Sequence, residues 1–282
     1  MQTIKIGNWR IKSLLGIVLM VLLGLVFIFP IYWMIISSIE PNWLVSSWPP
    51  AMYPRVLTAK TFMKIIGQPE TTPIIRWFFN SVLAASLYAV LSVLVDALAA
   101  YSLARLKFRG RKFLLTAIIA SLAIPGIMFF LPNYTTIKAL GWLNHYPAIV
   151  LTGLSLPFGV FLLHQFFKTL PQELEESASI DGAGIIRTLF TIIIPVAKTG
   201  IITLGVLNFL FNWKDYFWPL LVMYEPHMMT LPVGMATLQG TYVDYVNIQM
   251  AGAVITIVPS VIVFALVQKY YREGIITTGI KG

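Results

Sequence analysis

The chain contains no cysteine and little charge: only 11% of its 282 residues are Asp, Glu, Lys or Arg. The absence of cysteine excludes disulfide bonds, thiol chemistry and thiolate metal sites. Soluble domains carry about 25% charged residues, so this chain has too few polar side chains to cover a soluble globule. Hydrophobic residues make up 58%, and the mean hydropathy is +0.81. The composition therefore excludes a soluble enzyme, a disordered chain and a secreted disulfide scaffold, and indicates an integral membrane protein.

A second absence concerns chemistry. No Gly-Lys dipeptide occurs, so the phosphate loop that binds ATP in many ATPases is missing. The three histidines, His145, His164 and His227, have no ligand-like spacing, and no cluster of catalytic residue types stands near one membrane interface. The sequence therefore predicts neither an enzyme nor a metal site, and no cofactor.

Six apolar stretches are long enough to cross a bilayer as helices, which takes about 20 residues each. Because these runs are long and continuous, helices are favoured over the alternating strands of a membrane barrel. The predicted fold is an all-α integral membrane protein with six transmembrane helices in a single domain, residues 1–282. Prolines at positions 125, 157 and 259 predict kinks within three of the spans. The spans cover residues 14–38, 78–104, 113–137, 147–167, 199–223 and 250–271.

The distribution of Lys and Arg predicts the orientation. Six spans place both termini on one side, and the termini and loops of that side hold 14 of the 20 basic residues. Because basic residues gather on the cytoplasmic side, both termini are expected in the cytoplasm and the chain in a bacterial inner or plasma membrane. The basic cluster at 105–112 fits a topology determinant, and membrane lipid is an expected partner of the chain as a whole. The alternative role of the cluster is binding of lipid headgroups or nucleic acid, and we expect no nucleic-acid partner.

The loop between the fourth and fifth spans, residues 168–198, holds four of the 11 acidic residues. Pro171 suits a first helical position, and the acids after it suit the positive end of a helix dipole. Asp181 and Gly182 predict a break, and a second short helical face follows until Pro195. Small residues in the first helix leave room for a cytoplasmic partner. The same residues also fit an ordinary amphipathic helix at the interface, and both readings stay open on this pattern alone.

The spacing in this loop resembles the EAA loop of ABC transporter permeases. The chain reads Glu176-Ser-Ala-x-x-x-Gly182, then nine residues, then Ile192-x-Ile194-Pro195. The family pattern is E-A-A, three residues, G, nine residues and I-x-L-P, so Ser177 and Ile194 depart from it with side chains of similar bulk. Further segments resemble the smaller six-span permease of maltose-type and multiple-sugar importers: Asn80-Ser81, Phe108-Arg109-Gly110, Asn212-Trp213 and the tail from Gly274 to Gly282.

The resemblance implies the fold of type I ABC importer permeases (the MetI-like fold) and the role of a sugar-importer permease, with an oligosaccharide as the expected solute. It also implies three kinds of partner: a second homologous permease, two cytoplasmic ATPase subunits and an extracytoplasmic sugar-binding protein. Glu176 is expected to make a polar contact with an ATPase, and Gly182 to form the turn. The implied ATPase-coupling residues are Glu176, Ser177, Ala178, Asp181, Gly182, Ala183, Pro195 and Lys281.

Polar residues inside the spans suggest a pathway. Asp96 is the only acid well inside a span, where it could serve transport or bond a neighbouring helix. Asn208 and Asn212 are four residues apart and share a helix face; with Phe211 they could line a sugar path, or they could join helices by hydrogen bonds. An ion-coupled secondary transporter is the alternative function. It requires midplane ion-binding groups and an inverted repeat, of which only Asp96 is present.

Overall fold

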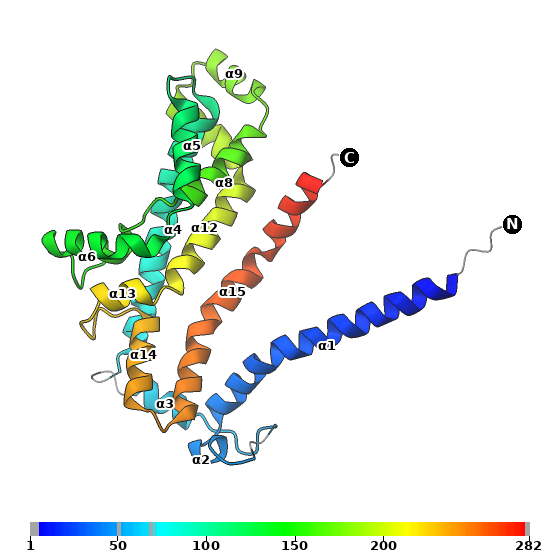
Figure 1. Cartoon of the computed structure of the whole chain (residues 1–282), viewed down its shortest axis with the longest axis vertical. Coiled ribbons are helices and arrows are strands. Elements are labelled where there is room, and N and C mark those ends of the chain that lie inside the picture. The colour runs from blue at the N-terminus through cyan, green and yellow to red at the C-terminus, as the bar shows by residue number, and fades with distance from the viewer. Residues whose placement is uncertain (1–5, 50–51, 68–69, 71, 280–282) are drawn as a thin grey trace. The chain divides into compact units, whose positions relative to one another are not determined.

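The computed structural model describes residues 6–49, 52–67, 70 and 72–279, and every regular element among them is a helix (Figure 1). The helices belong to two compact units. The first unit comprises Met1–Thr72 and Met235–Ile257, and the second comprises Pro73–Gly234 and Val258–Gly282.

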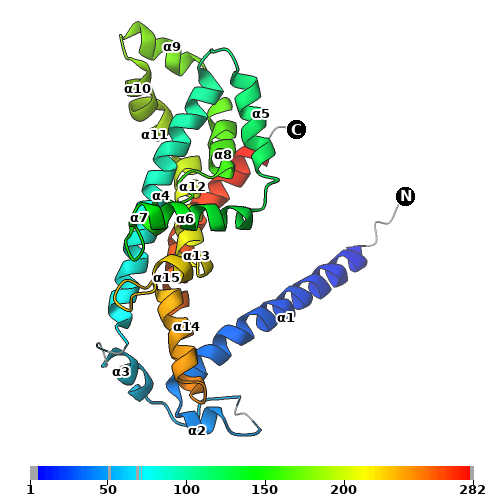
Figure 2. The same ribbon diagram turned by 60° about the vertical axis from the view of Figure 1, so that its left-hand side comes forward.

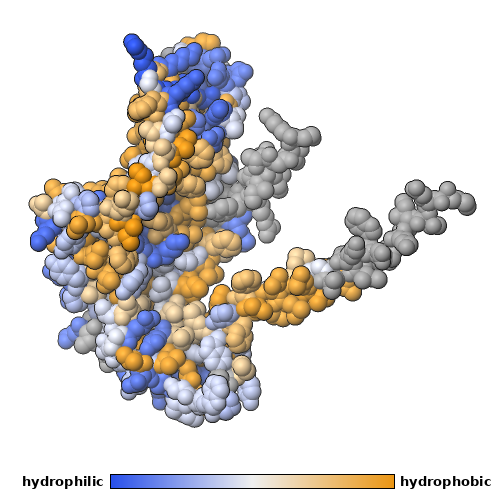
Figure 3. Space-filling view, viewed as in Figure 1, coloured by the Kyte–Doolittle hydropathy of each residue, from blue (hydrophilic) through white to orange (hydrophobic). Residues whose placement is uncertain are grey.

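The first unit contains the long helix α1, Ile6–Ile39, and the short helices α2, Asn42–Val45, and α3, Lys60–Ile66. It also includes the end of α14, Leu231–Thr241, and the start of α15, Val246–Gly279. Within Gly16–Ile39 the most apolar window is only 6% buried, and Figure 3 shows a hydrophobic surface along this helix. A bare apolar helix of this length suits lipid rather than water, as a membrane span requires.

Side-chain amides join the distant chain segments of the first unit. Asn247 Nδ2 donates to the Glu40 carbonyl at 3.3 Å and to Thr61 Oγ1 at 3.0 Å. Asn42 Nδ2 donates to the Asp244 carbonyl at 2.8 Å. The chain after α1 and the chain before α15 are therefore hydrogen-bonded to each other within this unit.

The second unit is built around α4, Ile74–Arg105, which packs against α8 and α12 (Figures 1 and 2). Fully buried alanines such as Ala84, Ala97 and Ala100 lie along α4, and small side chains let neighbouring helices approach closely. The other elements are α5 (Arg111–Ser121), η1 (Gly126–Phe129), α6 (Phe130–Ala139), α7 (Pro147–Val150), α8 (Pro157–Lys168), α9 (Glu173–Ile180), α10 (Ile185–Thr188), the π-helical turn η2 (Leu189–Ile193), α11 (Ile194–Val196), α12 (Lys198–Trp213) and α13 (Phe217–Val222).

Three of the six predicted spans are long apolar helices: Gly16–Ile39, Ile74–Arg105 and Val246–Leu266. Over 113–137 the backbone changes direction far more sharply than a kink: α5 ends at Ser121, and the following η1–α6 segment is bent from it by 97°. Pro125 lies at this break. Proline has no N–H to donate, and it disfavours helical geometry in the residue before it.

The fourth and fifth stretches also differ from single helices. Over 147–167 the regular helix α8 begins only at Pro157 and has 12 residues, which is about 18 Å and too short for a hydrocarbon core about 30 Å thick. Over 199–223, α12 ends at Trp213, and it is bent by 85° from Ile185–Val196. By length and composition the described residues therefore provide three to five candidate spans rather than six. Pro259 lies inside the continuous helix α15 and does not interrupt it.

The first turns of α4 hold a later chain segment by its main chain. Trp77 Nε1 donates to the Pro226 carbonyl at 2.6 Å. Asn80 Nδ2 donates to the carbonyls of His227 and Met229, both at 2.9 Å. The loop before α14 is thus attached to α4 through carbonyl oxygens.

Candidate functional site

The predicted helix–break–helix in the 168–198 loop is confirmed. Helix α9 ends at Ile180, and two residues later Gly182 has a φ of 76°, which lies in the left-handed region. The Ala183 N–H donates to the Ala178 carbonyl at 2.9 Å, and the Gly182 N–H donates to the Ser179 carbonyl at 3.1 Å. This pair of bonds is a Schellman motif, which satisfies the last carbonyls of a helix and favours glycine at the turn. A β-carbon at Gly182 would meet no atom within 4 Å, so only the backbone angle requires glycine here.

Helix α9 presents an exposed acid and an exposed isoleucine on one face. Glu176 and Ile180 are four residues apart, both are exposed, and Ile180 is 86% exposed. Ala178 is the buried residue of this helix. Figure 2 shows α9 leading through α10 and α11 toward α12, and hydrophilic residues gather at this end of the second unit (Figure 3). Ile180 was not predicted as a site residue. Its sequence signal is its position, one helical turn after Glu176 in an otherwise polar helix.

Arg105 anchors the start of this loop to the end of α4. Its Nη2 donates to the Leu170 carbonyl at 2.6 Å, and its Nε lies 3.5 Å from Glu175 Oε2. The Arg105 side chain is only 6% exposed. Arg111 Nη2 donates to the Ala104 carbonyl at 2.8 Å and so caps α4. Arg105 and Arg111 therefore have partners within the fold. A role as topology determinants did not predict these contacts.

The other predicted loop residues are placed as follows. Ser177 and Asp181 are exposed, and Ala183 is half-buried. Pro195 lies within α11, and the helical segment continues to Val196, one residue beyond the expected end. Lys281 lies outside the described residues.

Asp96 belongs to a buried polar network that joins three segments of the second unit. Ser155 Oγ donates to Asp96 Oδ1 at 2.6 Å, and Ser92 Oγ donates to Oδ2 at 3.3 Å. Asn208 Nδ2 of α12 donates to Ser92 Oγ at 2.9 Å. Asn212 Nδ2, also of α12, donates a hydrogen bond to the Ile149 carbonyl at 3.1 Å. These residues therefore form hydrogen bonds between chain segments, as expected if they join helices rather than line a sugar path.

We expect Gly159→Ala to destabilise the chain through Asp96. A β-carbon at Gly159 would clash with Asp96 Oδ2, and overpacking of this kind costs about 1–3 kcal/mol. Thermal unfolding of the purified chain in detergent measures the loss. In an Asp96→Ala background the same substitution should cost less, because the clashing carboxylate is gone. Equal losses in both backgrounds would show that the clash is not with Asp96.

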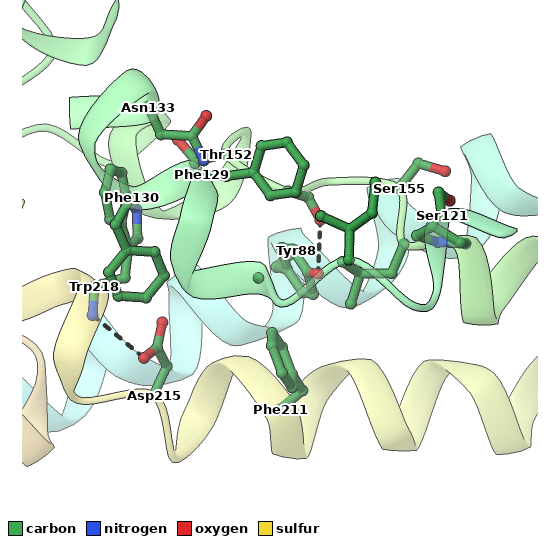
Figure 4. Close-up of a pocket in the computed structure, with 15 residues that line it drawn as sticks. Tyr88, Ser121, Phe129, Phe130, Asn133, Thr152, Ser155, Phe211, Asp215 and Trp218 are labelled. Atoms are coloured by element: carbon green, nitrogen blue, oxygen red, sulfur yellow. Dashed lines mark hydrogen bonds between the residues drawn. The ribbon is translucent and has the colours of Figure 1, made fainter. Parts of the chain in front are cut away.

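A cavity of about 500 Å³ opens in the second unit between α4, the bend before α6, the 152–157 segment and the end of α12 (Figure 4). Of the four predicted pathway residues, Phe211 lines it. The side chains labelled in Figure 4 are Tyr88, Ser121, Phe129, Phe130, Asn133, Thr152, Ser155, Phe211, Asp215 and Trp218. Among the described residues no group of three or more His, Asp or Glu could hold a metal ion.

Long apolar helices, sharply bent helix pairs and an exposed polar loop are the features of an all-helical membrane protein. A family model described as "Binding-protein-dependent transport system inner membrane component" matches residues 97–276, and the chain belongs to this family. It is therefore an inner-membrane permease subunit of an ABC importer, in which a separate subunit hydrolyses ATP. This confirms the predicted family and sets aside the ion-coupled secondary transporter.

Individual relatives match over nearly the whole chain. The arabinooligosaccharides transport system permease protein AraQ of Halalkalibacterium halodurans is 34% identical over 257 residues, covering 90% of this chain and 91% of the relative. The trehalose/maltose transport system permease protein MalG of Thermococcus litoralis is 31% identical over 278 residues, covering 96% and 98%. A chain of a bacterial ABC transporter involved in the import of alginate superposes with a TM-score of 0.82 at 22% identity, covering 96% and 100%. That superposition confirms the fold as an all-helical importer permease.

Proposed function

We propose that the chain is one of two permease subunits in a type I ABC importer that brings a sugar, most simply an oligosaccharide, into a bacterial cell. Relatives named for arabinooligosaccharides and for trehalose and maltose support the solute class, since they align over at least 90% of the chain. In this assembly a second permease supplies the other half of the pathway. An extracytoplasmic binding protein delivers the sugar, and two ATPase subunits bind from the cytoplasm.

The proposal treats residues 1–282 as one permease domain that crosses the membrane six times, with both termini in the cytoplasm. The excess of Lys and Arg on one side supports this orientation. The bent and short segments at 113–137, 147–167 and 199–223 would then cross as broken spans. Irregular backbone is tolerated at membrane depth where it is buried in protein or lines a cavity.

The observation that carries the coupling role is the exposed face of α9. Ile180 is almost fully exposed four residues after Glu176, and a partner's cleft that covered this apolar side chain would gain free energy by removing it from water. The turn at Gly182 presents this face, and Arg105 ties it to α4. ATP-driven closure of the partner would therefore move α9 and, through Arg105, the transmembrane core, which is a rigid-element switch.

Co-purification from membranes tests the docking role. A tagged wild-type chain should bring down an ATPase and a second permease, whereas Glu176→Lys and Gly182→Arg should lose the ATPase and keep the permease. Glu173→Lys is the matched control, because Glu173 is an exposed acid of the same helix outside the motif. If the chain purifies alone and stable, or if all variants retain the ATPase, the docking proposal is wrong.

A further inference from the structure

The cavity beside α12 has a wall of aromatic rings. Tyr88 and Phe211 are stacked with centroids 6.3 Å apart and an interplanar angle of 28°. Phe130 and Trp218 lie 5.8 Å apart. Figure 4 shows these two pairs at separate parts of the cavity, with Phe129 between them. A volume of about 500 Å³ lies within the usual range for small-molecule sites, roughly 300–1,000 Å³. Aromatic faces of this kind suit the C–H faces of a sugar ring.

One polar group in the wall has no partner. Thr152 Oγ1 is buried and makes no hydrogen bond within the described part of the chain. Leaving a buried hydroxyl unbonded costs about 1–3 kcal/mol, and because Thr152 also lines the cavity, a ligand there could supply the missing partner. Asn133 stands next to Thr152 in Figure 4. A ligand that carries hydroxyl groups could bond both.

The charge of the wall restricts the ligand further. Asp215 is the one charged side chain among the lining residues, all of which lie in the described part of the second unit. Its Oδ1 accepts a hydrogen bond from the main-chain N–H of Trp218 at 3.4 Å, as Figure 4 shows. With no Lys, Arg or His in the wall, an anion would meet only like charge at low dielectric. A hydroxyl group, by contrast, can donate to the carboxylate.

We propose that this cavity is a subsite for one neutral sugar ring of the imported solute and that Asp215 excludes anionic solutes from it. The inference rests on the proposed function and deepens it, because it assigns direct sugar contact to this subunit. It also predicts that this chain does not admit the anionic solutes named for some relatives, such as sn-glycerol 3-phosphate and the acidic polysaccharide alginate.

The absence of cysteine makes the test direct, because one introduced thiol is unique in the chain. Thr152→Cys and Phe211→Cys each place the thiol in the cavity. If one variant fails to fold, the other still tests the proposal. Thr135→Cys is the control, since Thr135 is exposed on α6 and does not line the cavity. Each variant is purified in its assembled importer, and the rate of labelling by a water-soluble methanethiosulfonate is measured. The probes are trehalose, maltotriose, arabinotriose, sn-glycerol 3-phosphate and an alginate trisaccharide.

We expect at least one neutral sugar to slow labelling of both cavity thiols, by roughly tenfold at ~10 times its Kd, and the control thiol to label at an unchanged rate. The two anions should give no protection until Asp215 is replaced by asparagine. Protection by the anions in the presence of Asp215 would overturn the charge selectivity. Cavity thiols that no neutral sugar protects, or that label only in the isolated chain, would overturn the subsite. Failure of the importer to assemble would instead contradict the proposed function.

Discussion

Replacing Arg105 with alanine should uncouple transport from ATP hydrolysis while the ATPase stays bound. The substitution removes two contacts that hold the loop to α4, the hydrogen bond to the Leu170 carbonyl and the ion pair with Glu175. Breaking a buried ion pair costs about 3–5 kcal/mol, but Glu175 is 20% exposed and regains water, so we expect about 1–3 kcal/mol. Since about 1.4 kcal/mol is a factor of ten, sugar uptake in proteoliposomes should fall by roughly tenfold or more, with ATPase activity retained.

Two matched variants separate this role from a general loss of positive charge. Arg109→Ala removes an exposed charge from the basic cluster at 105–112 and should leave uptake unchanged. Arg105→Lys keeps the charge but lacks the guanidinium fork that reaches two acceptors, and it should give an intermediate rate. Amide hydrogen exchange over 170–180 should be faster in Arg105→Ala than in wild type. Normal uptake together with unchanged exchange would show that Arg105 does not couple the loop to α4.

Replacing Ile180 with aspartate should remove the ATPase from the complex. Burying an isoleucine side chain on docking contributes about 1.5–3 kcal/mol, and the new carboxylate would stand beside Glu176 and Asp181. The lost apolar contact alone corresponds to roughly a 10- to 100-fold weaker affinity, and desolvation of the added charge lowers it further. Titration of the purified ATPase onto the immobilised permease measures the change.

The folded permease itself should be unaffected, because Ile180 is exposed in the free chain. Thermal unfolding of Ile180→Asp in detergent should therefore match wild type. Ile180→Leu is the conservative control and should keep most of the affinity, since it preserves apolar volume. Wild-type affinity in Ile180→Asp would mean that the exposed isoleucine is not part of the docking surface.

Hydropathy predicted the membrane class and three of the long helices, because a span needs only enough consecutive apolar residues. It did not predict where the backbone turns. The bend of 97° after Ser121 and the late start of α8 at Pro157 both lie inside apolar runs, where composition does not change. Pro125 and Pro157 were recognised as sources of kinks, but their positions do not say whether a helix bends, breaks or begins.

The Asp181-Gly182 pair predicted the turn in the 168–198 loop from neighbouring residues. Gly182 has the positive φ that such a turn requires. The anchor Arg105 was not predicted, because the carbonyl it bonds is 65 residues further along the chain. Thr152 was not predicted either. Its hydroxyl is buried without a hydrogen-bond partner, which becomes evident only from the packed structure. Contacts between distant segments, rather than local patterns, determine both.

The segment between α13 and α14 is hydrogen-bonded through its main chain, while Met223 and Met228 pack in the core beneath it. Trp77 and Asn80 bond its carbonyls, and Asn144 Oδ1 accepts the N–H groups of Tyr224 and Glu225 at 2.8 and 2.9 Å. The exposed side chains there take no part in this attachment. They are therefore interchangeable, and related importers can alter the chemistry of this surface by substitution while the path of the chain stays the same.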